Sequence, residues 1–163
     1  LFRSERMGAI DANPANGGDV PASAGAFAKI HTGTVDFAAQ LTVPDALDFQ
    51  QAIGTPARAA RLRWLRDRWA ERLRGLDGLE ILTPADPRLH GGITSFRIRG
   101  RTSAADNVAV ARALLDEFGI FTVHRTGVAK GACVRVTPAL FTTPDQVDAL
   151  ARALEVLVPR MKA

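Results

Sequence analysis

The segment from Gly119 to Thr143 reads GIFTVHRTGVAKGACVRVTPALFTT. It holds two short β-type runs, Ile120–Val123 and Cys133–Thr137, on either side of a glycine-containing loop. One arginine follows the first run and another lies inside the second, at Arg125 and Arg135. A guanidinium that points into a fold needs an anion, because a buried unpaired charge is costly. Its planar shape pairs best with a carboxylate or a phosphate. The segment therefore predicts an anion-binding site.

Composition limits the classes of protein that this chain can belong to. Its 163 residues are 47% hydrophobic, which is enough for one ordinary domain with its own core. The net charge of +4 comes from arginines spread among acidic residues, without a run of like charge or an aromatic platform. That pattern disfavours nucleic-acid binding. The single cysteine, Cys133, lies in an apolar run, so we interpret it as a small buried hydrophobe, and we expect no metal site.

The sequence also bears on location. No stretch approaches the roughly 18 consecutive apolar residues of a membrane span, and the first residues lack the architecture of a signal peptide. We therefore expect a cytoplasmic protein with no membrane partner. Because the chain starts at Leu1, without an initiator methionine, we interpret it as a piece of a longer protein.

Two helices are expected before the first strand. The first runs from Asp36 to Ile53, with Pro44 as a kink or new first turn. The second opens at Thr55-Pro56, as an N-cap followed by proline, and continues to about Gly75. The apolar anchors of the first helix are Phe37, Leu41, Leu47 and Phe49, and the buried stripe of the second is Leu62, Leu65, Trp69, Leu73 and Leu76. The arginines of the second helix are interpreted mostly as a solvated face: Arg58, Arg61, Arg63, Arg66, Arg68, Arg72 and Arg74.

After Leu79 the pattern changes to short runs that alternate with helices. The expected order is β-β-α-β-β-α, which predicts an α+β fold with an antiparallel sheet covered by helices on one face. The β-type runs are Leu79–Leu82, Gly92–Ile98 and the two runs of the opening segment. The helix from Ala104 to Phe118 has Ser103 and Asp106 as a capping box, Gly119 as C-cap, and Val108, Ala111, Leu115 and Phe118 inward. The last helix starts at the Thr143–Gln146 cap, buries Val147, Leu150, Leu154 and Leu157, and is stopped by Pro159.

A series of motifs from Thr32 to Val158, about four fifths of the chain, resembles the C-terminal part of class V aminotransferases. These are fold-type I enzymes that depend on pyridoxal phosphate (PLP), and they include cysteine desulfurases and isopenicillin N epimerase-like proteins. Each motif is weak alone, and the series is fairly specific. The motifs are Gly33-Thr34, Ala46–Phe49, Ala52–Gly54, Arg125–Gly127, Val134–Pro138, Phe141–Thr143 and Val147–Leu150.

The resemblance implies a role for particular residues. Gly33 and Thr34 would contact the phosphate of PLP bound in the neighbouring subunit of a homodimer. Arg135 would bind the α-carboxylate of an amino-acid substrate, and Arg125 would assist it. The expected organisation is a tail of the large domain with an irregular loop over residues 1–34, a helical link between domains over 35–75, and a small C-terminal α+β domain over 76–163.

The sequence departs from the family pattern at two points. The lysine that forms the Schiff base with PLP lies upstream in the family, and neither Lys29 nor Lys130 has its context. We therefore expect no covalent PLP on this chain and assign no catalytic residue. Desulfurases place a reactive cysteine in the loop after Arg-Thr-Gly, whereas Cys133 falls on the strand, so epimerase-like and transaminase-like activities remain. The alternative is a stand-alone, non-catalytic α+β module for binding or dimerisation. His31, His90 and His124 are interpreted as structural or exposed, with His124 kept as a possible neighbour of the site.

Overall fold

The computed structural model describes residues 37–127 and 129–162, and the chain divides into two units, residues 1–49 and 50–163. In the first unit, α3 (Phe37–Leu41) is followed by α4 (Val43–Ile53), which crosses into the second. The expected helix is therefore broken at Thr42, where Pro44 supplies the first turn of α4. Neither helix contains a buried residue, and the four predicted apolar anchors are exposed.

The first helix that lies wholly in the second unit is α5 (Thr55–Leu73), with 19 residues. Its N-cap is Gly54, with φ of 83°, and not Thr55 as the sequence predicted. The left-handed backbone at Gly54 suits glycine, and Pro56 follows in the first turn. Of the predicted stripe, Leu65, Trp69 and Leu73 are buried, while Leu62 and Leu76 are half-buried.

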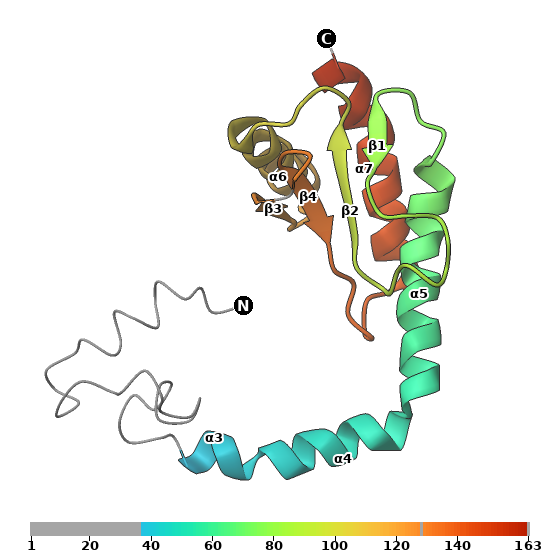
Figure 1. Ribbon diagram of the computed structural model, residues 1–163, viewed down its shortest axis with the longest axis vertical. Helices are drawn as coiled ribbons and strands as arrows, with labels where there is room; N and C mark the ends of the chain where they lie inside the picture. Colours follow the sequence, from blue (N-terminus) through green and yellow to red (C-terminus); the bar gives the residue numbers. More distant parts are fainter. Residues whose placement is uncertain (1–36, 128, 163) are drawn as a thin grey trace, which may run out of the picture. The chain divides into compact units, whose positions relative to one another are not determined.

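Four strands form one antiparallel sheet in the order β1-β2-β4-β3. The strands are β1 (Leu79–Ile81), β2 (Thr94–Ile98), β3 (Val123–Arg125) and β4 (Cys133–Val136). Helix α6 (Ala104–Phe118) connects β2 to β3, and α7 (Pro144–Lys162) follows β4. The predicted α+β class and β-β-α-β-β-α order are confirmed, although β3 starts where its expected run ended. Figure 1 shows α5 and α7 running side by side next to the sheet.

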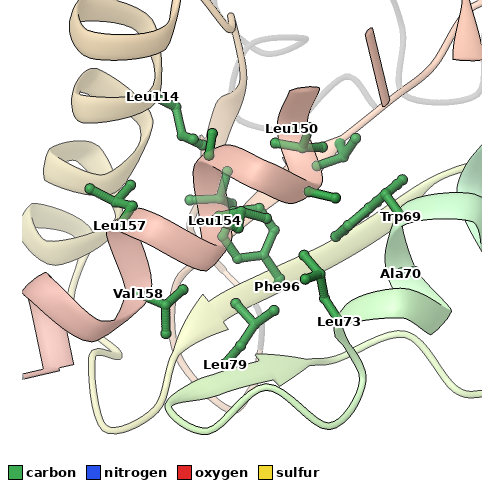
Figure 2. Packing of buried hydrophobic residues seen from close by; sticks show 14 of the residues in the cluster. Trp69, Ala70, Leu73, Leu79, Phe96, Leu114, Leu150, Leu154, Leu157 and Val158 are labelled. Carbon is green, nitrogen blue, oxygen red and sulfur yellow. The ribbon is translucent and has the colours of Figure 1, made fainter. Parts of the chain in front are cut away.

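The sheet has a core face and an opposite face. Phe96 and Ile98 of β2 and Val134 and Val136 of β4 join one buried cluster with residues of α5, α6 and α7. In Figure 2, Trp69 and Leu73 of α5 and the leucines of α7 surround the ring of Phe96. The Trp69 and Phe96 rings meet edge to face, with centroids 6.0 Å apart. Because side chains alternate along a strand, the residues between these apolar ones lie on the opposite face.

The inward face of α6 differs from the prediction. Val108 and Leu115, expected inside, are 40% and 45% exposed, whereas Val110 and Leu114 are buried. Both sets recur at helical spacing, so periodicity alone could not choose between them. Asn107 helps to select the observed face, because its buried amide donates to the carbonyls of Arg101 and Ser103.

The local signals at helix ends were read more accurately. Ser103 caps α6 by accepting from the Asp106 amide, and Gly119 ends it with φ of 67°. Thr143 and Gln146 exchange the two bonds of a capping box at the start of α7. Pro159, however, lies inside α7 and does not stop it. Proline removes one backbone donor, and contacts of the final turn, such as the bond from Arg101 to the Met161 carbonyl, keep the helix going.

Candidate functional site

Arg135 lies in the middle of β4, the strand between β2 and β3. It pairs with Ser95 on one side and Val123 on the other, and it lies on the face opposite the core. The residue is half-buried, and its Nε atom is shielded from solvent without an acceptor. Its side chain makes no hydrogen bond or ion pair with any residue that the structure describes. A buried donor without a partner is costly, so this nitrogen suits an external anion.

Arg125 ends β3 and pairs with Cys133, while Val123 pairs with Arg135. The two arginines are therefore diagonal neighbours on one sheet face, a pair of positions that typically lie about 7–8 Å apart. Within the described chain, Arg125 donates only to the adjacent carbonyl, from Nη1 to His124 O at 3.2 Å. The fold thus brings the two predicted arginines together at the distance from which long side chains can converge on one anion. His124, which lies between Val123 and Arg125 on β3, alternates to the other face and is exposed.

Arg97 lies on the same face, but its guanidinium is fully used. It is 4% exposed, and its Nε donates to Glu80 Oε2 at 2.8 Å. Its Nη1 donates to the carbonyl of Lys130 at 2.6 Å. The hydrogen bond from Arg97 holds the pKa of Glu80 below its ordinary value, against the opposing effect of desolvation. Arg97 is therefore not available to a ligand.

Arg66 corrects the interpretation of α5 as carrying a solvated arginine face. It is 1% exposed, and its Nε donates to Thr94 Oγ1 at 3.0 Å. Further bonds reach the carboxylates of Asp67 and Glu71 and the carbonyl of Pro84. A signal was present in the sequence, since position 66 precedes Trp69 and Leu73 by three and seven residues and so shares their helix face.

Two other arginines of α5 join it to α7. Arg68 binds both carboxylate oxygens of Asp148 at 2.8 and 2.7 Å, and Arg72 binds Glu155 through two bonds of 2.9 Å. The hydrogen bond from Arg68 lowers the pKa of Asp148. These arginines serve the helix pair and are distinct from the anion site.

A cleft of about 690 Å³ opens where α6 ends and α7 begins. Its walls include Phe118, Thr137, Phe141 and Leu150, and no charged side chain of the described chain lines it. The cleft therefore offers no positive charge to an anion, and we distinguish it from the site formed by Arg125 and Arg135.

Several predicted residues lie outside the described part of the chain, namely Gly33, Thr34, Lys29 and His31. Among the described residues, no group of three potential ligands could hold a metal ion. None of the described helices is both long enough and apolar enough to cross a membrane. Cys133 is a free, buried thiol, as its apolar run predicted.

The fold agrees with solved structures of related architecture, although no family model matches the sequence. The apo structure of a cysteine desulfurase from Thermococcus onnurineus NA1 superposes with a TM-score of 0.65 at 20% identity. The match covers 82% of this chain and 34% of that one. The architecture is that of the small C-terminal domain of fold-type I enzymes.

Two curated relatives are isopenicillin N epimerases. That of Streptomyces clavuligerus is 34% identical over 128 residues, and that of Amycolatopsis lactamdurans is 38% identical over 125 residues. Each match covers 77% of this chain and 30% of the relative, so the chain spans less than a third of the relatives' length. The predicted resemblance to the C-terminal part of class V aminotransferases, which are fold-type I enzymes, is confirmed. Within that family, its similarity is to part of the isopenicillin N epimerases.

Proposed function

We propose that this chain is the carboxylate-binding part of a PLP-dependent enzyme, of the aminotransferase or epimerase type, that acts on an amino acid. Arg135 holds the α-carboxylate of the substrate, and Arg125 assists from the neighbouring strand. The observation that carries the proposal is the buried Nε of Arg135, which has no acceptor among the described residues. The similarity to families of PLP-dependent enzymes supports the assignment to a PLP-dependent enzyme, and the amino-acid substrate is part of the proposal.

The described residues fit a substrate carboxylate and do not fit the cofactor itself. Of their two lysines, Lys162 pairs with Asp77, and Lys130 is exposed beside the Glu80–Arg97 pair. Neither lysine forms a hydrogen bond or ion pair with Arg125 or Arg135. We propose that Gly33 and Thr34 contact the PLP phosphate across a homodimer, and that the group forming the Schiff base is not on this chain.

The arginine pair can be tested in the 163-residue chain with acetate, the simplest carboxylate. Nitrogen-15 NMR can follow the Nε–H signals of the arginines during an acetate titration at constant ionic strength. We expect the Arg135 signal to shift to saturation, with a smaller shift at Arg125, because a charge-assisted bond forms at the unpartnered nitrogen. Arg135→Lys should abolish the response at Arg125.

Arg99 provides the matched control. It follows β2, is 67% exposed and lies 3.9 Å from Asp77. Arg99→Lys should leave the acetate response of Arg135 unchanged. If the Arg135 signal moves no more than that of Arg99, acetate is associating only with surface charge and the proposal is wrong.

A further inference from the structure

Arg97 connects the centre of the sheet to the segment that leads into β4. Its carboxylate partner, Glu80, is its register partner on β1. Two of the guanidinium nitrogens of Arg97 bond Glu80, and the remaining nitrogen, Nη1, donates to the carbonyl of Lys130. One buried guanidinium therefore ties β1 and β2 to residues 130–132, immediately before β4.

Residues 130–132 are held from a second direction by Thr102. The amide of Ala132 donates to the Thr102 carbonyl at 2.7 Å. Gly131 has φ of 100°, and a Cβ atom there would lie 2.7 Å from Thr102 Cβ and 3.3 Å from Arg97 Nη1. The close approach requires glycine at position 131, because a side chain there would displace either Thr102 or the guanidinium of Arg97.

The position of these three residues decides where β4 begins. With β4 starting at Cys133, Arg135 pairs with Val123 and Ser95 and shares a face with Arg125. A shift of one residue would turn Arg135 towards the core face, because strand side chains alternate. The contact between Arg97 and the Lys130 carbonyl therefore lies where it can help to fix the start of β4.

We propose that Arg97 is a positioning residue for the anion site: it clamps residues 130–132 and so keeps Arg135 on the face of Arg125. This inference rests on the proposed function, because it assumes that Arg135 binds an anion. The contact of Arg97 with residues 130–132 can nevertheless be measured separately, by amide hydrogen exchange. All three guanidinium nitrogens of Arg97 are occupied within the chain, so it acts through Arg135 and not by touching the ligand.

The test compares Arg97→Met with the wild-type chain by amide hydrogen exchange and by the acetate titration. Methionine keeps much of the length and the apolar contacts of the side chain, and the Glu80 side chain that it leaves is 42% exposed, so the fold should persist. We expect the Ala132 amide to exchange about tenfold faster, as for loss of one charge-assisted bond. Amides of α7, such as Leu154, should keep their protection. Acetate binding at Arg135 should weaken about tenfold as well.

Two further variants separate positioning from general stability. Glu80→Gln removes the ion pair but leaves the Lys130 contact, so Ala132 should keep its protection. Arg97→Lys keeps the charge but lacks the planar, forked guanidinium, so it should restore only part of the protection. Equal acceleration at Ala132 and Leu154 in Arg97→Met would show a merely structural role and overturn the inference, and so would unchanged exchange at Ala132.

The acetate arm distinguishes the two proposals. If the wild-type chain does not respond to acetate, the proposed function fails, and the exchange data alone decide for or against the clamp. If the wild-type chain responds and Arg97→Met responds equally, the site does not depend on Arg97 and the positioning inference is wrong.

Discussion

Arg66 and Arg135 both place guanidinium nitrogens out of contact with water, and they differ in what surrounds them. Arg66 donates to a hydroxyl, two carboxylates and a backbone carbonyl. Arg135 has a buried Nε and no side-chain partner among the described residues. The hydrogen bonds of Arg66 offset the cost of removing its guanidinium from water. The same cost at Arg135 is not offset within the described chain and can be offset by a bound ligand. Burial alone therefore does not separate a structural arginine from a ligand-binding one. The presence or absence of hydrogen-bond acceptors for the buried nitrogens does.

The largest expected effect is on the stability of the partnered arginine. Arg66→Met should lower the free energy of unfolding by about 2–4 kcal/mol, because it strands the buried Thr94 hydroxyl and the Pro84 carbonyl and removes well-packed atoms. Urea denaturation of the 163-residue chain measures this change. Arg63→Met, an exposed position on the same helix, is the control and should lie within about 0.5 kcal/mol of the wild type. A similar result for both variants would contradict the structural role of Arg66.

The unpartnered arginine should behave in the opposite way. Arg135→Met should change the free energy of unfolding by less than about 1 kcal/mol, because it removes a donor that has no acceptor in the described chain. The same denaturation experiment measures it, and the acetate response should disappear in this variant. A loss of stability as large as that of Arg66→Met would mean that Arg135 has a structural partner, and the comparison would fail.

The smallest effect is a dependence of stability on pH that arises at Glu71, the carboxylate shared by Arg74 and Arg66, and to which Arg135 should not contribute. Glu71 accepts bonds from Arg74 and Arg66, and the Arg74 hydrogen bond is the main reason that its pKa lies below the ordinary value of 4.5. A depressed carboxyl pKa contributes stability that is present above 4.5 and is lost as pH falls through the folded-state value. Glu71→Gln should therefore flatten the fall in melting temperature below pH 4.5. Arg135→Met should keep the wild-type slope.

The sequence anticipated those features that depend on neighbouring residues. The caps at Ser103 and Thr143 and the C-cap at Gly119 were predicted correctly because each is a bond within a few residues. The strand pairs and the α+β class followed from the change of period after Leu79. Arg135 and Arg125 were singled out from their β-type runs, and the structure places them on one face.

Two missed features are local, since Gly54 caps α5 in place of Thr55 and Pro159 lies inside α7, and the others depend on contacts far along the chain. The inward face of α6 was misassigned because two stripes fit helical spacing, and only packing against the sheet and the Asn107 bonds separates them. Arg66 was taken for a surface residue because charge normally indicates exposure, although its partners Thr94 and Pro84 are distant in sequence. The division of the chain at residues 34 and 75 stays a prediction, as does the contribution of Gly33 and Thr34.

The pairing of α5 with α7 has a consequence for how this chain acquires its fold. Ion pairs between the two helices join residues 80 and 83 positions apart, and seven residues of α7 are buried. During synthesis, the apolar stripe of α5 is therefore covered only after α7 has emerged. Contacts so distant along the chain slow folding, because the intervening loop must close before they contribute. The same helix pair that completes the core thus makes the burial of α5 dependent on residues 144–162.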